Sequence, residues 1–250
     1  MVEENRIIHE VKITNKTEEA AYFARNNIPY IVYLTQDNRT DHFPNGAYCV
    51  EDLKDVDTQY CERVYRRFKG IPWDIAETDR LRIREITVED VPRLYELYQD
   101  GSITQYMEPL FPEVQQEIEY TKEYIKNIYG FYGYGMWAII EKQSGQMIGR
   151  VGFEYKEGFE GLELGFMLGV DYQGKGYAYE ACCAVLNYGI NGLGHKKYCA
   201  FVNEENTMSI KLCEKLGFHR NKTIQRNEMN TEGVMVEKSF LRYEYDAKDL

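Results

Sequence analysis

A glycine-rich turn between two apolar runs is the feature that most limits how this chain can fold. Residues 162–190 read LELGFMLGVDYQGKGYAYEACCAVLNYGI. The run before the turn is short and apolar, as in a buried strand. After the turn, small and apolar residues recur at helical spacing, at Ala178, Ala181, Cys182, Val185, Leu186 and Gly189. The segment therefore predicts a strand, a tight turn and a helix with one buried face, as in α/β proteins.

Two common phosphate-binding patterns fail at this turn. A dinucleotide fingerprint, G-x-G-x-x-G, fits Gly174 and Gly176 but meets Tyr179 where the third glycine belongs. A Walker-type loop, G-x-x-x-x-G-K-[ST], fits Gly169, Gly174 and Lys175. It then meets Gly176 in place of the hydroxyl that binds magnesium. Nucleotide hydrolysis through this loop is therefore a weak alternative.

A third pattern, Q-x-x-G-x-A, is complete at Gln173, Gly176 and Ala178. Small residues at the start of a helix leave several backbone N–H groups unpaired, and the helix dipole adds about half a positive charge there. The turn thus predicts a diphosphate site that needs no metal, formed by Gln173, Gly174, Lys175, Gly176, Tyr177 and Ala178. A tight turn that packs on the sheet and binds no ligand is the alternative.

The order of motifs around the turn carries a family resemblance. Downstream come Asn206 and Ser209 at N-x-x-S spacing, at the start of a predicted helix. The stretch EKLGF at 214–218 ends that helix with its glycine. Together with LELGFMLGVDYQGKGYAYEA, these motifs resemble the GNAT superfamily of N-acetyltransferases, and within it the RimJ/RimL type. The resemblance covers about residues 80–245.

The resemblance implies the GNAT fold, an α/β (α+β) architecture with a splayed mixed sheet flanked by helices. It also implies acetyl-coenzyme A as the cosubstrate, no metal, and transfer of the acetyl group to a primary amine. Backbone groups of Met167 and Leu168 would pair with the pantetheine arm. Asn206 would face that arm, and Ser209 would lie near the thioester sulfur.

Acetyl transfer to an amine needs a base or a proton wire, because a lysine-like amine is almost fully protonated at pH 7. We nominate Glu163, on the strand before the turn, acting through water. Glu154 on the preceding strand is the second choice. A solvated or salt-bridged strand residue is an equal alternative for Glu163.

A second group is needed to reprotonate the leaving thiolate. Many GNAT enzymes carry a tyrosine just before the stretch that reads EKLGF here, and this chain has Cys213 at that position. The departure removes the usual tyrosine acid. Ser209 or ordered water is then the expected donor, and Cys213 is expected to be a core residue.

An aromatic cluster precedes the strand that should edge the acceptor groove, with members Tyr129, Phe131, Tyr132, Tyr134 and Trp137. Tyr132 or Tyr134 is expected to contact a cationic amine through a ring face or a hydroxyl. Half of the rings are expected in the core instead. A predicted loop at Arg226–Gly233 and the helix region at Tyr95–Tyr106 would frame the entry. The acceptor stays open between a protein N-terminus and a small-molecule amine.

Residues 1–75 are predicted to form a separate small domain. Strand-like and helical runs alternate there, which indicates a Rossmann-like α/β layer. The region loosely resembles part of a haloacid-dehalogenase-like domain, but that family's aspartate-rich nucleophile motif is absent, so an accessory or docking role is expected. The joint is GIPWDIAETD, Gly70–Asp79, and residues 76–250 form the acetyltransferase domain.

Charge and composition exclude several classes of protein. A net charge of −11 argues against nucleic acid as the main partner and mildly favours a cationic substrate. No apolar run approaches the ~20 residues of a membrane span, and the first residues lack the features of a signal peptide. The six cysteines show no zinc spacing and no C-x-x-C pair, so reduced thiols in the cytoplasm are expected. A monomer and a homodimer both stay open.

A catalytically weak, coenzyme A-binding regulatory module is the main competing function. The extra N-terminal domain and the missing tyrosine would then mark lost turnover. An open acceptor groove beside Glu163 favours the enzyme, whereas a groove plugged by the aromatic cluster favours the regulatory module.

Overall fold

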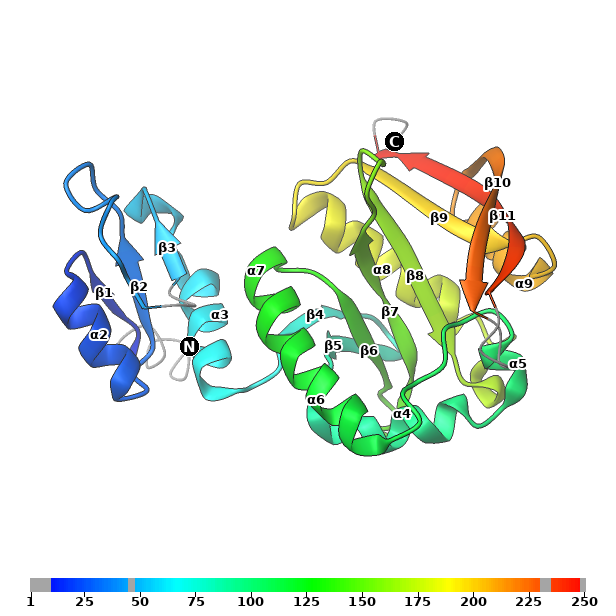
Figure 1. The fold of residues 1–250 in the computed structure, drawn as a ribbon, viewed down its shortest axis with the longest axis horizontal. Coiled ribbons are helices and arrows are strands. Elements are labelled where there is room, and N and C mark those ends of the chain that lie inside the picture. Colours follow the sequence, from blue (N-terminus) through cyan, green and yellow to red (C-terminus); the bar gives the residue numbers. More distant parts are fainter. Residues whose placement is uncertain (1–9, 45–47, 230–234, 248–250) are drawn as a thin grey trace. The chain divides into compact units, whose positions relative to one another are not determined.

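The computed structural model describes residues 10–44, 48–229 and 235–247. The chain divides into two compact units, Met1–Trp73 and Asp74–Leu250, whose elements are labelled in Figure 1. In the parts that are described, no helix is both long and apolar enough to cross a membrane. Each unit is built on a sheet of its own.

The N-terminal unit is a small α/β layer. Its three-stranded sheet is parallel, in the order β1-β2-β3. The elements are β1 (Lys12–Thr14), α2 (Thr17–Arg25), β2 (Tyr30–Tyr33), β3 (Tyr48–Val50), the 3-10 helix η1 (Leu53–Asp55) and α3 (Thr58–Lys69). Because β1, α2 and β2 form a strand–helix–strand crossover with parallel strands, the predicted small α/β layer is confirmed.

Alternation along β2 separates the two faces of this small sheet. Ile31 packs with Val64 of α3, whereas Tyr30 and Val32 pack with Ala20 of α2. Successive side chains of a strand point to opposite faces. The two helices therefore cover opposite faces, and each face has a core of its own.

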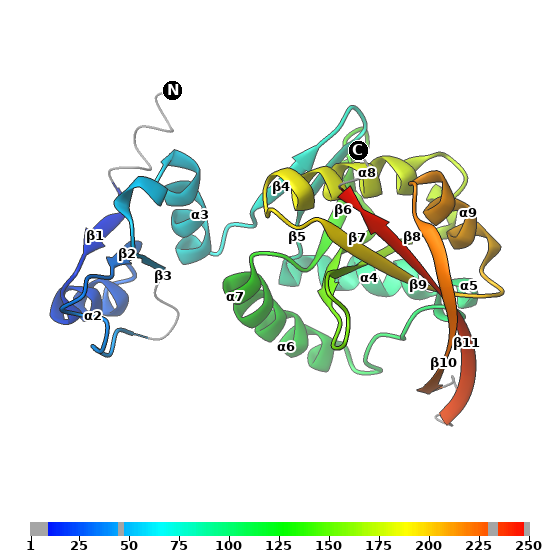
Figure 2. The same ribbon diagram turned by 90° about the horizontal axis from the view of Figure 1, so that it is seen from above.

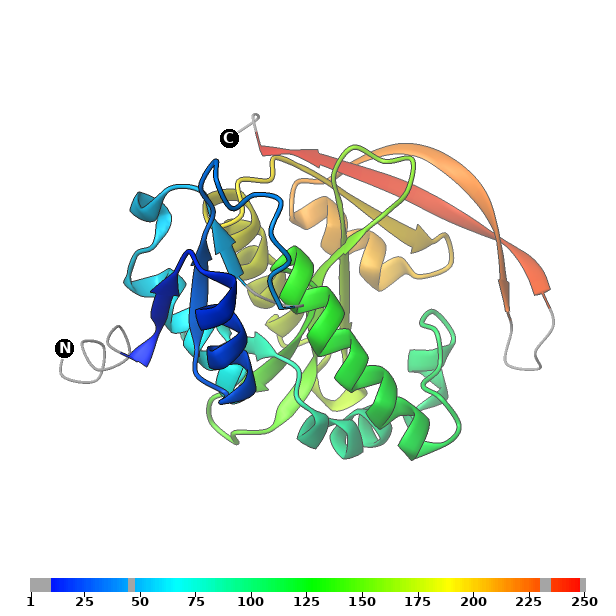
Figure 3. The ribbon, with the colours of Figure 1, turned by 60° about the vertical axis from the view of Figure 1, so that its left-hand side comes forward.

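The C-terminal unit is built on an eight-stranded mixed sheet in the order β10-β11-β9-β8-β7-β6-β5-β4. All neighbours are antiparallel except β8 and β9, which are parallel. The strands are β4 (Asp74–Glu77), β5 (Leu81–Glu85), β6 (Met136–Glu141), β7 (Met147–Tyr155), β8 (Leu162–Leu168), β9 (Lys197–Asn203), β10 (His219–Met229) and β11 (Met235–Asp246). Figure 3 shows β10 and β11 as a long paired ribbon at one edge.

Helices cover both faces of this larger sheet. They are η2 (Val88–Asp90), α4 (Val91–Tyr98), α5 (Gly101–Thr104), α6 (Val114–Tyr124), η3 (Ile125–Tyr129), α7 (Gly130–Tyr132), η4 (Val170–Tyr172), α8 (Tyr177–Asn191) and α9 (Thr207–Lys215). Figure 2 shows α8 and α9 on one side of the sheet and α4 and α6 on the other. Leu94 and Leu97 of α4 pack with Met167, whereas Trp137 contacts Tyr188 of α8.

The sheet opens between β8 and β9. Their pairing is limited to Leu162 with Tyr198 and Glu163 with Cys199. Residues 164–168 of β8 pair with β7 alone, so the other edge of this segment has no strand beside it. The predicted splayed mixed sheet flanked by helices is confirmed.

Two segments differ from the sequence prediction at the ends of this sheet. Asp74–Glu77, expected in the joint, forms edge strand β4, and Arg82 of β5 ion-pairs with its first residue at 2.6 Å. Its polar composition, typical of an edge, hid it in the sequence. The loop expected from Arg226 begins later, because β10 continues to Met229. Residues 230–234 of that loop lie outside the described residues.

Helix α6 changes character after Tyr124, where a π-helix carries the chain on to Tyr129. The rings of Tyr124 and Tyr129 lie 5.4 Å apart, edge to face. The hydroxyl of Tyr124 accepts from the Met136 amide, and that of Tyr129 donates to the Met136 carbonyl. A five-residue turn places both tyrosines on one side of the helix, where they bond the start of β6.

Candidate functional site

The phosphate turn, Gln173–Ala178, leads into α8 through glycines in the left-handed region. Gly174 has a φ of +71°, and Gly176, the N-cap of α8, has a φ of +82°. Residues with a Cβ rarely adopt these angles. Gly174, Lys175 and Gly176 are exposed, and no side chain caps the helix. The first N–H groups of α8 are therefore accessible to an anion.

Arg80 ties the phosphate turn to the start of β5. Its Nη1 donates to the Lys175 carbonyl at 3.0 Å, and its Nε donates to Glu180 Oε2 at 2.7 Å. Its guanidinium lies 4.4 Å from the centre of the Tyr177 ring. Glu180 also accepts from the Thr78 hydroxyl at 2.6 Å. The structure thus places a cation beside the turn that sequence reasoning did not identify.

Side chains of the turn bond to their own surroundings. Gln173 Nε2 donates to the Leu168 carbonyl at 3.0 Å, which fixes the turn to the end of β8. The Tyr177 hydroxyl donates to Glu141 Oε1 at 2.6 Å. The side chains of Met167 and Leu168 are buried, so any role they have toward a ligand belongs to their backbone. The turn is therefore held by side chains, while its glycine amides stay exposed.

The start of α9 brings together two residues that the sequence singled out. Asn206 is the N-cap, and its Oδ1 accepts from the Ser209 amide at 3.1 Å. Cys213 lies one helical turn further on and is fully buried. Burial raises the pKa of the Cys213 thiol to about 12. Cys213 is therefore a core residue, as predicted.

Glu154 of β7 and Glu163 of β8 are direct cross-strand partners, and we call them the carboxylate pair. Such partners share one face of the sheet, with Cβ atoms about 4.5–5.5 Å apart. Glu154 is an exposed residue, but neighbouring groups take water from its carboxyl and so raise its pKa, and the charge of Glu163 raises it further. Glu163 Oε2 is buried and lies 3.2 Å from Lys156 Nζ. A carboxylate so placed can accept a proton from an amine.

Further polar side chains lie near the carboxylate pair and were missed from the sequence. Arg150 lies four residues before Glu154 on β7, so its side chain points to the same face of the sheet. It donates a hydrogen bond to the Tyr98 hydroxyl. Tyr120 and Tyr124 of α6 interact electrostatically with both Arg150 and Glu154. Burial raises the pKa of Tyr124, whereas the Tyr120 side chain is half exposed. The i, i+4 spacing of these tyrosines was the available signal.

Tyr132 and Tyr134, the predicted acceptor contacts, lie elsewhere. Tyr134 is buried, and its ring centre is 5.5 Å from Tyr132 and 5.8 Å from His195, which follows α8. Tyr155, which also interacts with Tyr134, follows Glu154 on β7 and so points to the opposite face. The structure does not bring Tyr132 and Tyr134 together with the carboxylate pair. Their contact with an acceptor stays a prediction.

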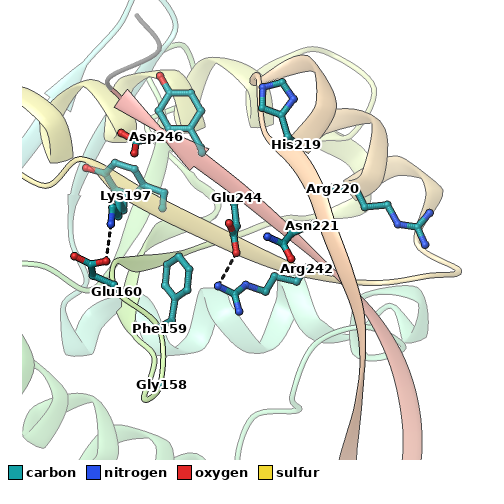
Figure 4. A pocket seen from close by; sticks show the side chains of 12 residues that line it. Gly158, Phe159, Glu160, Lys197, His219, Arg220, Asn221, Arg242, Glu244 and Asp246 are labelled. Atoms are coloured by element: carbon teal, nitrogen blue, oxygen red, sulfur yellow. Dashed lines mark hydrogen bonds and ion pairs between the residues drawn. The ribbon is translucent and has the colours of Figure 1, made fainter.

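A pocket of about 440 Å³ lies between the β7–β8 loop and strands β9, β10 and β11. Figure 4 shows its ion pairs, Arg242 with Glu244 and Lys197 with Glu160, each at 2.5 Å. The guanidinium of Arg242 also lies 4.6 Å from the centre of the Phe159 ring. The cations of these pairs are neutralised by their carboxylates, as Arg80 is by Glu180 beside the phosphate turn. The accessible amides at the start of α8 are what make the turn better suited to an anion.

A second opening, of about 650 Å³, borders the phosphate turn and is lined by residues that include Arg80, Gly176, Glu180 and Cys183. Its volume is in the range of about 300–1,000 Å³ that small-molecule sites occupy. Within the described ranges, no group of three or more His, Cys, Asp or Glu side chains could hold a metal ion. The donors that converge here are backbone amides and a guanidinium, which fit a phosphate.

Comparison with known proteins adds independent findings. Residues 80–219 match the family model of the acetyltransferase (GNAT) domain. A Bacillus licheniformis protein named "Uncharacterized N-acetyltransferase p20" is 31% identical over 176 residues, which cover 67% of this chain and 96% of that protein. YkkB of Bacillus subtilis is 32% identical over 152 residues, which cover 60% of this chain and 87% of that protein. The matched family segment includes both the carboxylate pair and the phosphate turn.

Solved structures share the fold of the C-terminal unit. A GNAT-family acetyltransferase from Bacillus anthracis aligns with a TM-score of 0.58 at 22% identity, covering 69% of this chain and 98% of that chain. RimL, a ribosomal L7/L12 alpha-N-protein acetyltransferase, gives 0.58 at 15% identity, with 70% and 95% covered. A variant of spermidine N-acetyltransferase SpeG from Vibrio cholerae gives 0.56 at 18% identity, with 69% and 96% covered. At these identities the likeness concerns the fold.

Proposed function

This chain belongs to the acetyltransferase (GNAT) family, and on that premise we propose that it transfers an acetyl group from acetyl-coenzyme A directly to a primary amine. One observation carries the proposal. The open edge of β8, residues 164–168, leads directly toward the phosphate turn with its exposed glycines. A long thioester arm that ends in a diphosphate matches an extended strand edge followed by free amides.

The cosubstrate would be held mainly by backbone groups. Amides of Gln173–Ala178 would bind the diphosphate, and Arg80 would add positive charge beside it. Backbone groups of Met167 and Leu168 would pair with the pantetheine arm, and Asn206 would face it further along. Because none of these contacts needs a metal, binding is expected in the presence of a chelator.

The carboxylate pair would supply the base. A lysine-like amine has a pKa near ~10.4, so only about one molecule in 2,500 is neutral at pH 7. We assign proton removal to Glu163, directly or through one water, with Glu154 as the second candidate. The neutral amine then attacks the thioester carbonyl carbon, and the C–S bond breaks.

The leaving thiolate takes up a proton from the Ser209 hydroxyl or from ordered water. Ser209 lies in the first turn of α9 and is the last residue of the N-x-x-S motif. Asn206, the first residue of that motif, caps the helix. Cys213 would not serve, because its buried thiol has a pKa of about 12. A coenzyme A thiolate is a good leaving group, so a modest donor suffices.

The direct test is release of free thiol from acetyl-coenzyme A over a panel of amines. The panel contains a peptide with a free N-terminus, a polyamine, an aminoglycoside and single amino acids. At least one of them should raise the rate well above hydrolysis. Tight cofactor binding with no acceleration by any amine would favour the second candidate, a coenzyme A-binding regulatory module. The buried cysteine at the usual tyrosine position is the observation that keeps this candidate in view.

The N-terminal unit lies outside the matched family segment, and we propose an accessory or docking role for residues 1–75. We also propose a cytoplasmic location, which the cysteine usage supports, and either a monomer or a homodimer is compatible with the proposal. Deleting this unit while retaining turnover on a small amine would support the accessory role.

A further inference from the structure

Lys156 lies directly beside the proposed base. It follows β7 immediately, and its Nζ is 3.2 Å from the buried Oε2 of Glu163. Among the ion pairs of the described residues, it is the lysine that pairs with Glu163. The protein thus carries a primary amine of its own at the carboxylate that would deprotonate an acceptor.

The surroundings of Lys156 differ from those of an ordinary surface ion pair. The Glu163 side chain is 17% exposed, whereas the Lys156 side chain is 39% exposed, so the pair joins a mostly buried carboxylate to an amine that solvent can reach. On β9, across the opening from β8, the centre of the Phe201 ring lies 5.9 Å from Lys156 Nζ. Glu154, the other carboxylate, lowers the net charge near the amine. Carboxylates and a ring face are the groups that an acceptor ammonium needs.

We propose that Lys156 is an internal acetyl acceptor, which is acetylated on Nζ when no external amine occupies the site. This inference rests on the proposed function. Glu163 takes a proton from the ammonium, and neutral Nζ attacks the thioester carbonyl carbon. The new N–C bond forms as the C–S bond breaks, and coenzyme A leaves as a thiolate that takes up a proton. The products are one amide on Lys156 and one free thiol.

Position supports this assignment. An amine that Glu163 deprotonates directly, or through one water, must lie within a few ångströms of its carboxylate, and reacting atoms meet at about 3–3.5 Å. Lys156 Nζ already satisfies the first condition. An external amine must displace Lys156 to reach the same oxygen. Acceptor and Lys156 are therefore expected to compete.

Lys197 provides a matched control. Its side chain is 41% exposed, close to the value for Lys156, and its ion-pair partner at 2.5 Å is Glu160 (Figure 4), not Glu163 of the carboxylate pair. Uncatalysed acetylation by acetyl-coenzyme A would therefore affect both lysines to a similar extent. Any excess of acetylation at Lys156 over Lys197 therefore measures the contribution of the site.

The experiment incubates the full chain with acetyl-coenzyme A without added amine and follows intact mass and peptide maps over time. We expect Lys156 to gain one acetyl group at least about tenfold faster than Lys197. Glu163→Gln should remove this excess and leave the slow reaction at Lys197 unchanged. Lys156→Arg should abolish the fast mass increase, whereas Lys197→Arg should retain it. A reactive external amine should slow acetylation of Lys156.

The outcomes separate this inference from the proposed function. Thiol release with an external amine, together with equal acetylation of Lys156 and Lys197, overturns the internal acceptor and leaves the acetyltransferase intact. Fast acetylation of Lys156 that persists in Glu163→Gln also overturns it, because the reaction would then not pass through the site. If neither an external amine nor Lys156 accepts the acetyl group, the proposed function falls as well.

Discussion

The phosphate turn and the carboxylate pair lie on the same sheet but are constructed in different ways. The turn is a continuous stretch whose glycines adopt left-handed angles, so the groups proposed to bind the cosubstrate are backbone amides fixed by local geometry. The carboxylate pair exists only because β7 and β8 align Glu154 with Glu163. The comparison teaches that the proposed binding half of this site is specified locally, whereas the proposed chemical half depends on strand register.

The largest effect is expected at the turn. Gly176→Asp places a carboxylate where the diphosphate is proposed to bind, and a Cβ at a φ of +82°. Like charges in contact cost several kcal/mol, so affinity for acetyl-coenzyme A should fall at least about 300-fold. Titration calorimetry measures it directly.

Gly145→Asp is the matched control for this change. Gly145 also has a positive φ, +69°, and open space around it, but it lies in the β6–β7 hairpin. Both variants carry the same charge and a similar backbone strain, so their melting temperatures should be alike. Equal losses of affinity in the two would mean that the phosphate turn is not the binding site.

The next effect tests the chemical half. Glu163→Gln should lower turnover about 100-fold, the usual contribution of a general base, with little change in cofactor affinity. Without the base, the rate depends on the free neutral amine, so it should rise about tenfold per pH unit up to the pKa of the acceptor. A pH–rate profile of the variant that matches the wild type in shape would remove Glu163 as the base.

The contrast also explains what the sequence could predict. The left-handed glycines, the helix after them and the buried face of α8 follow from local spacing, and the GNAT fold, the N-acetyltransferase class and a strand at Leu162–Leu168 were all predicted correctly. Strand β4, at the end of the predicted joint, was not predicted, because it is short and polar and pairs with β5. Periodicity carries no information on such tertiary pairing.

The site residues divide in the same way. Asn206 and Ser209 lie close to each other because they are three residues apart at the start of a helix. Arg80 was missed, because it reaches Lys175 across 95 residues of chain. Tyr134 lies apart from the carboxylate pair, because alternation along β7 turns its neighbour Tyr155 to the other face, and its contact with an acceptor stays a prediction. Contacts between distant segments are set by register and packing, which spacing within one segment does not record.

Arg80 and its neighbour Arg82 sharpen the comparison further. Arg80→Ala removes the hydrogen bond to the Lys175 carbonyl and the cation beside the turn, so cofactor affinity should fall about tenfold. Arg82→Ala removes a similarly exposed guanidinium, 43% against 45%, whose partner is Asp74 on edge strand β4. Its affinity should stay at the wild-type value. Equal effects of the two substitutions would show that the turn orders itself without Arg80.

The smallest effect concerns Glu154. Loss of water and the charge of Glu163 raise the pKa of Glu154 above its ordinary 4.5, while Lys156 and Arg150 act in the opposite direction. Both folded and unfolded forms are protonated well below pH 4.5, so Glu154→Gln should then leave the melting temperature unchanged. As pH rises through the raised pKa, the ionised carboxylate destabilises the folded wild type, so the melting temperature of the glutamine variant rises relative to that of the wild type.

Solvent near Glu154 screens the effect, so we expect a gain of about 1–2 °C at pH 8, measured by thermal unfolding. A gain of the same size at pH 3 and pH 8 would show that register does not couple the two carboxyl groups, and the chemical half of the site would then rest on Glu163 alone.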